Sequence, residues 1–244
     1  MIEYQKIFYI MFKGLPGSDD YLFIQALINE FNGVYQTDRI YVKKETEAVV
    51  FLSAQEFVGD DPSNLDYGIY FNYENKCRLV TAIQGVRMVT ELKSGINIAQ
   101  ITSKDIITHG TKLILSGTTE QLPFMMQMAK DLDFPVEAMI PIDCGKKGVG
   151  NTKTQFVTVQ QYYTSKMDKL PKHLTFVSTA YHVPRVARTG NANLMTSISF
   201  DVIPVPCSML SGDYPFNIAN QFISEAGKII EYSNRGDITR DLRI

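Results

Sequence analysis

The chain has 244 residues, of which 45% are hydrophobic and 20% charged, and its formal net charge at pH 7 is −2. These values are typical of a globular protein long enough to bury its own core. They exclude a strongly basic nucleic-acid binder, and no apolar run approaches the roughly 20 residues of a membrane-spanning helix. The three cysteines lack the spacing of a zinc site or a disulfide framework. We therefore expect a cytoplasmic protein with no metal site, no nucleic-acid partner and no membrane insertion.

The first part of the chain, residues 1–45, is expected to form two helices that pack as an N-terminal extension on a domain spanning 46–244. The second helix would begin after Ser18, whose side chain suits an N-cap. Two aspartates follow it and favour the helix dipole.

Beyond this extension, five short apolar runs predict strands. They lie at 48–52, 112–116, 137–142, 174–178 and 200–205. Continuous apolarity, without alternation, indicates strands buried on both faces. Amphipathic helical patterns lie between and after them, at 120–132, 151–167 and about 217–234. The alternation predicts an α/β, Rossmann-like, doubly wound fold with a mainly parallel five-stranded sheet and helices on both faces.

The connection at 54–76 is long for a link between a strand and a helix. It contains a tyrosine-rich segment at 67–73. Loops at the carboxyl ends of strands border the ligand crevice of such sheets. The segment is therefore either a lid or pocket wall at that crevice or a hairpin that covers an edge.

Ser116, Gly117 and Thr118 follow the second predicted strand, at a corner that leads into a helix. Exposed amides at such a corner bind phosphate or carboxylate, although turn geometry alone also explains the glycine. The next corner offers Asn151 or Thr152 as a helix cap. Thr152 and Gln155 have the spacing of a capping box, which by itself explains both residues; the alternative is that they contact a ligand.

His182 and Arg185 follow the fourth predicted strand, beside the start of a helix with Pro184 near its first position. The helix dipole disfavours positive charge there, so two basic groups make sense if an anion shares the site. His182 could act as acid or base and Arg185 could grip a phosphate or carboxylate. The alternative is that Arg185 pairs with a carboxylate such as Glu225 and that backbone groups satisfy the histidine. His109 and His173 are expected to be solvated.

Taken in order, these motifs resemble the YdcF/SanA/ElyC-like family, a domain of unknown function, over roughly 48–236. The segments that carry the resemblance are "VVFLSAQ", "RLVTAIQGV" opened by Arg78, "LILSGT", "GNTKTQF", "VSTAYHVPRVART" and "FISEAGKIIEYSNRG" with its late Glu and Lys. The histidine–arginine motif is the most specific of them. The resemblance implies a Rossmann-like fold, with Arg78 and Glu225 lining the pocket or orienting other groups. It also makes S-adenosylmethionine a possible ligand, because one type of member is reported to bind it.

The chain departs from the family pattern at four positions. Ser53 and Thr118 replace glycines, and Thr154 and Gln155 stand where Glu and Asn are usual. If that glutamate is the family's acid–base group, this chain has lost it and keeps binding alone.

Three functions follow as hypotheses. The first is binding of a small anionic or nucleotide-like ligand, S-adenosylmethionine or a phosphorylated metabolite, at the carboxyl ends of the strands. The second is hydrolysis or transfer at a phosphate ester with His182 as the catalytic acid/base. The third is a non-catalytic protein-interaction domain that uses 67–73 and the N-terminal helices as its partner surface.

Overall fold

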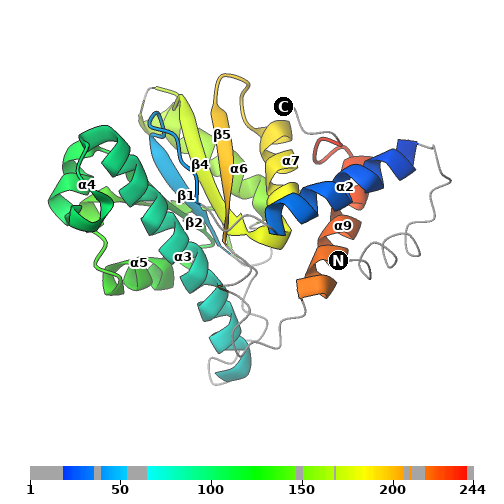
Figure 1. Ribbon diagram of the computed structural model, residues 1–244, viewed down its shortest axis with the longest axis horizontal. Helices are drawn as coiled ribbons and strands as arrows, with labels where there is room; N and C mark the ends of the chain where they lie inside the picture. Colours follow the sequence, from blue (N-terminus) through cyan, green and yellow to red (C-terminus); the bar gives the residue numbers. More distant parts are fainter. Residues whose placement is uncertain are drawn as a thin grey trace.

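The computed structural model describes residues 19–35, 40–53, 65–146, 151–167, 169–205, 209 and 218–240, and for some of them, such as 65–73, the backbone alone. Five strands form one parallel sheet in the order β3-β2-β1-β4-β5 (Figure 1). They are β1 (Ala48–Leu52), β2 (Lys112–Gly117), β3 (Met139–Asp143), β4 (His173–Thr179) and β5 (Ser199–Val205). This architecture confirms the predicted doubly wound α/β fold.

Helices cover both faces of the sheet. On one face lie α3 (Leu65–Ser94), α4 (Ser103–His109) and α5 (Leu122–Asp131), and on the other α6 (Thr152–Lys166) and α7 (Val183–Asn193) (Figure 1). Strand β1 shows why its sequence is apolar throughout. Val49 and Phe51 pack in the core on the α3 side, while Val50 and Leu52 pack in the core on the α6 side. Successive side chains of a strand point to opposite faces, so a strand covered on both sides has no polar face.

A third apolar cluster joins α2 (Asp19–Tyr35) to α9 (Ile218–Asn234). Helix α2 lies against α7 and against the short 3₁₀ turn η3 (Ala180–His182) at the end of β4. Arg188 of α7 donates two hydrogen bonds to Glu30 of α2, at 2.6 and 2.7 Å. The expected first helix and the Ser18 cap lie outside the described residues.

The tyrosine-rich segment is helical. Helix α3 begins at Leu65, so the expectations of a loop and of a hairpin over 65–76 are wrong. That this segment forms a lid or a pocket wall stays a prediction. Extending a helix that is already packed on the sheet costs far less than starting one, which favours helix even for residues of low helix propensity. The side chains of 67–73 and the stretch 54–64 are outside the described residues, so the partner-surface hypothesis stays a prediction.

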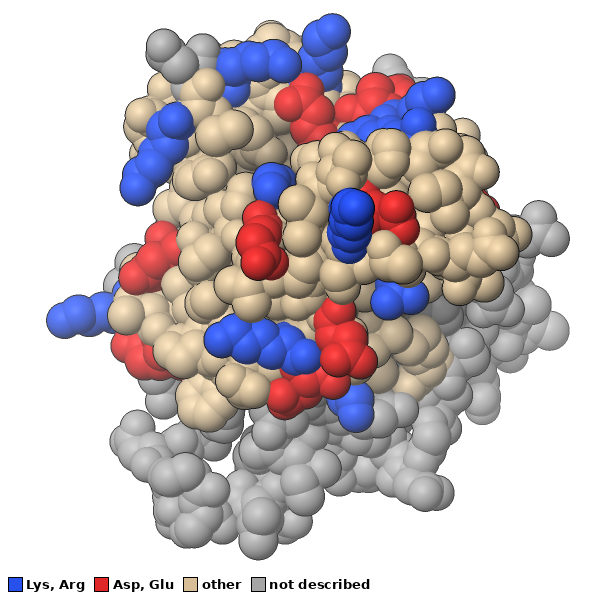
Figure 2. Space-filling view, turned by 90° about the vertical axis from the view of Figure 1, so that its left-hand side faces the viewer, with Lys and Arg blue, Asp and Glu red and all other residues tan. Residues whose placement is uncertain are grey.

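Two general features of the described residues concern charge and hydrophobicity. On the face that carries α4 and α5, acidic and basic side chains are interspersed, as Figure 2 shows. Within the described ranges, no helix combines the length and the apolarity needed to cross a membrane.

Candidate functional site

The site lies where the strand order reverses. Strand β1 is paired with β2 on one side and with β4 on the other. After β1, the chain therefore adds strands first on one side of it and then on the opposite side. In open α/β sheets the ligand crevice lies outside the carboxyl ends of the strands at this switch point. Residues that the sequence singled out occur on both sides of it.

Arg78 bridges the carboxyl ends of β1 and β4. Its guanidinium donates to the Leu52 carbonyl at 2.9 Å and to Thr179 Oγ1 at 2.8 Å. It also pairs with Glu74, one helical turn earlier, at 2.6 Å. Glu74 in turn accepts a hydrogen bond from the Tyr181 hydroxyl at 2.8 Å. The Arg78 side chain is only 3% exposed, so these bonds place a buried cation at the switch point.

Gln155 bridges β1 and β2 in the same way. Its side-chain nitrogen donates to Ser53 Oγ and to the Ser116 carbonyl, both at 3.0 Å. Ser53 stands where the family pattern has glycine, and here it supplies the hydroxyl that Gln155 contacts.

The predicted capping box of Thr152 and Gln155 is wrong. Asn151 is the N-cap of α6, and its side chain and that of Thr154 exchange hydrogen bonds with each other's backbone. The pattern of a capping box fits either register, and asparagine is at least as good a cap as threonine. Thr152 and Gln155 are thereby left free to point inward, where both are buried.

His182 is the last residue of η3 and the N-cap of α7, and Pro184 lies in the first turn of that helix. Ser178 Oγ lies 2.9 Å from its Nδ1 and Thr152 Oγ1 lies 3.4 Å from its Nε2. Hydroxyl groups, not the expected backbone groups, therefore satisfy the ring. Burial lowers the pKa of His182 well below its usual value, and the nearby charges of Arg185, Arg78 and Lys228 lower it further. The imidazole is neutral at pH 7.

Arg185 pairs with Glu225, as the alternative interpretation expected. Its Nε and Nη2 both donate to that carboxylate, and Nη1 donates to Thr152 Oγ1 at 3.3 Å. The same carboxylate accepts a second cation, Lys228, at 2.9 Å. The Glu225 side chain is 3% exposed, so one buried carboxylate is shared by two basic groups.

The corner after β2 is built for packing. A Cβ on Gly117 would come within 2.7 Å of Met125 Sδ, so a larger residue would require the Met125 side chain to move. The Thr118 amide donates to Gln121 Oε1 at 2.9 Å. Turn geometry thus accounts for Gly117 and Thr118 in this structure, whereas the Ser116 carbonyl takes part in the site through Gln155.

Ser116 also leads to a residue that the sequence did not single out for this site. Its hydroxyl lies 3.2 Å from the Cys144 sulfur, which in turn lies 3.1 Å from Thr158 Oγ1. Burial raises the pKa of the Cys144 thiol, so this cysteine is a neutral packing group and not a reactive thiolate.

Glu74 and Tyr181 are two further members of the site that were not predicted from the sequence. The only local signal for Glu74 was its spacing of four residues from Arg78, which is favourable for an ion pair on a helix. Tyr181 sits in the histidine–arginine motif, but its partner is 107 residues away, a contact that no local pattern reveals.

Comparisons with known proteins give no match: the chain matches no family model, no curated protein and no solved structure.

Proposed function

We propose that this protein binds a small anionic or nucleotide-like ligand, a phosphorylated metabolite or S-adenosylmethionine, at the carboxyl ends of β1 and β4. We further propose that it is a divergent member of the YdcF/SanA/ElyC-like family that works in the cytoplasm. The order of its motifs supports the family, and the buried thiol of Cys144 is compatible with that compartment.

One observation carries the proposal: the described part of the site holds more positive than negative charge. Three cations, Arg78, Arg185 and Lys228, surround the neutral His182, and their charges bear on it together. They are paired with two carboxylates, Glu74 and Glu225. Charges in a buried site attract an opposite charge much more strongly than they would in water.

The arrangement suits a phosphate or carboxylate group. Arg185 is 15% exposed and Lys228 is 29% exposed, so both reach the surface of the site while Glu225 stays beneath them. The start of α7 adds a favourable end of a helix dipole, since its cap position is held by a neutral histidine with no side-chain cap bond. A phosphate would satisfy both cations; S-adenosylmethionine would offer only its carboxylate.

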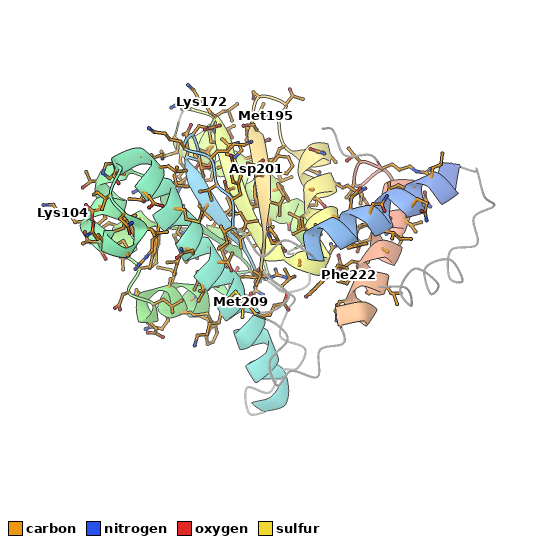
Figure 3. All side chains as sticks on the ribbon, in the orientation of Figure 1. Lys104, Lys172, Met195, Asp201, Met209 and Phe222 are labelled. Atoms are coloured by element: carbon orange, nitrogen blue, oxygen red, sulfur yellow. The ribbon has the colours of Figure 1, made fainter. Side chains whose placement is uncertain are left out.

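Titration calorimetry tests the proposal. The wild type is titrated with ADP, glucose 6-phosphate and S-adenosylmethionine, and the expected result is saturable binding of at least one. Arg185→Ala should weaken that binding about 10- to 100-fold, the effect of losing a hydrogen bond to a charged group. Lys104→Ala, which removes a cation from the distant helix α4 (Figure 3), is the control and should bind like the wild type. The proposal is wrong if no compound binds or if Arg185→Ala binds equally well.

A second function, hydrolysis or transfer at a phosphate ester, is favoured by the state of His182. The neutral ring has an unprotonated nitrogen and two hydroxyl groups lie at its nitrogens, although its lowered pKa makes it a weaker base than a free imidazole. This function predicts release of phosphate from p-nitrophenyl phosphate or ADP, and loss of that activity in His182→Ala. A wild type that is inactive with and without Mg²⁺ would contradict it.

A further inference from the structure

A second cluster of reactive side chains lies at the opposite end of the sheet, where β4 and β5 begin. His173 opens β4 and Ser199 opens β5, and the two residues are partners in the strand register. Asp201 follows two positions later and therefore points to the same face as Ser199. In Figure 3, the labels Lys172, Met195 and Asp201 mark this end of the sheet. The cluster is separate from the His182 site, which lies at the carboxyl ends.

The three side chains form a continuous chain of contacts. Ser199 Oγ lies 2.8 Å from His173 Nδ1. On the other side of the ring, His173 Nε2 lies 3.2 Å from Asp201 Oδ2. Lys43 Nζ contacts the same carboxylate at 3.1 Å. The close contacts of the carboxylate with His173 and Lys43 lower the pKa of Asp201, so the carboxylate is ionised beside the ring.

The burial of this cluster differs from what sequence analysis expected. The His173 side chain is 1% exposed, not solvated, whereas Ser199 is exposed. His173 Nε2 and Asp201 Oδ2 are both buried, and the 3.2 Å contact between them is not aligned as a hydrogen bond. A serine at the surface thus stands in front of a buried imidazole that is backed by a carboxylate.

A hollow opens beside the serine. It has a volume of about 310 Å³ and Ser199 is one of its lining residues. Its lining is more polar than apolar: Asn191, Thr196 and Ser199 line it together with Leu194, Met195 and Ile198. A hollow of this size has room for a small ester next to a reactive hydroxyl.

We propose that Ser199, His173 and Asp201 form a nucleophile–base–carboxylate site that is acylated on Ser199 by small, uncharged esters. The roles match those of a serine-hydrolase triad with the two ring nitrogens exchanged. The site is independent of the ligand site at the carboxyl ends of the strands, and the failure of either proposal leaves the other standing.

The chemical step conserves atoms and charge. Ser199 Oγ bonds to the ester carbonyl carbon while His173 Nδ1 takes the hydroxyl proton, and the imidazolium that forms is stabilised by Asp201. The carbon–alkoxide bond then breaks, and the proton passes to the leaving alcohol. Water repeats the sequence and releases the carboxylic acid. The Ser199 hydroxyl has one proton, and it also contacts the Lys172 carbonyl at 2.8 Å, so the proton must turn from that carbonyl to the ring before reaction.

Covalent labelling of the full chain tests this site. The wild type is treated with a fluorophosphonate probe and, separately, with p-nitrophenyl acetate, and the modified residue is located by tandem mass spectrometry. With the fluorophosphonate, the Oγ–P bond forms, the P–F bond breaks and the proton leaves with fluoride. Both probes should modify Ser199. Ser197, an exposed serine two positions earlier, is the internal control and should react at the background rate.

Variants separate a triad from an accidental contact. His173→Gln should slow the labelling of Ser199 about a hundredfold or more, the effect of removing a general base. Because His173 is buried, Asp201→Asn is the second variant; its carboxylate is 32% exposed, and we expect labelling to slow at least tenfold while circular dichroism is unchanged. The proposal is overturned if Ser199 reacts no faster than Ser197, or if neither variant slows its reaction.

Discussion

His182 shows at the scale of one residue how the fold sets chemistry. The same side chain on a surface loop would titrate near neutral pH. Here, burial and three neighbouring cations keep the ring neutral. A neutral ring adds no positive charge at the start of α7, where the helix dipole would oppose it. Of the two basic residues predicted at this corner, Arg185 alone is therefore charged, and Glu225 balances its charge.

The lowered pKa of His182 predicts a pH dependence of stability. Below about pH 6.5 the unfolded chain takes up a proton at this residue that the folded chain does not, so the free energy of unfolding falls as the pH falls. The slope for one proton approaches about 1.4 kcal/mol per pH unit. Urea unfolding between about pH 7 and 5 should therefore show a shallower fall for His182→Asn than for the wild type. His109→Asn is the control, and parallel curves for all three proteins would contradict the expectation.

Glu225 is predicted to hold two cations in place at the expense of anion affinity. Glu225→Gln leaves Arg185 and Lys228 without their shared carboxylate, and the variant should be destabilised by on the order of 3 kcal/mol. Inorganic phosphate should then restore part of the loss, because it binds the folded state alone. Thermal melts with and without phosphate measure this. Equal phosphate effects on the Tm of variant and wild type would contradict the role assigned to Glu225.

At the scale of elements, α7 and β5 pack so closely that a glycine is needed between them. A Cβ on Gly190 would come within 2.5 Å of the Phe200 ring and 2.9 Å of the Phe156 ring. Gly227, inside α9, has no atom within 4 Å of such a Cβ. Packing therefore requires a glycine at 190, whereas it leaves room for a larger side chain at 227.

Alanine at these two positions should act in opposite directions. Gly190→Ala should lower the free energy of unfolding by about 1–3 kcal/mol through overpacking. Gly227→Ala should raise it by about 0.5–1 kcal/mol, since glycine is a poor helix former and nothing obstructs the methyl group. Chemical denaturation measures both. A neutral Gly190→Ala variant would mean that the α7–β5 packing described above is wrong.

Helix α2 is predicted to be held by the pair of Arg188 and Glu30. The Arg188 side chain is 1% exposed and the Glu30 side chain 23%, so Glu30→Gln leaves a buried cation poorly compensated. We expect the backbone amides of α2 to exchange with deuterium at least tenfold faster in this variant, while those of β1 keep their protection. Hydrogen-exchange mass spectrometry measures this; unchanged exchange in α2 would show that the apolar contacts of Phe23 and Leu27 hold the helix alone.

At the scale of the whole molecule, the sheet could be predicted because its strands carry their own signal. Strand β1 has the predicted limits, and the others differ by two residues or fewer at either end. Burial on both faces makes such strands apolar without interruption. The start of α3 gave no comparable signal, since "DYGIYFNY" contains glycine, asparagine and tyrosine, which are weak helix formers.

The sites were less predictable because they depend on contacts between distant segments. Sequence analysis placed His182 and Arg185 at one corner, and the Arg185–Glu225 pair was foreseen as an alternative. It could not foresee that Arg78 would reach Thr179, 101 residues away. His173 was also predicted to be solvated, because the residues that bury it lie at the start of the neighbouring strand and not near it in the sequence.

The central claim, that the cations around His182 bind an anion, is tested most directly by nitrogen-15 NMR of the histidine rings. The chain has three histidines, so the ring signals can be assigned with single substitutions. At pH 7 we expect a neutral His182 ring whose nitrogen shifts move on titration with ADP or phosphate, while those of His109 and His173 stay fixed. A His182 ring that is charged at pH 7, or that does not respond to either compound, would contradict the claim.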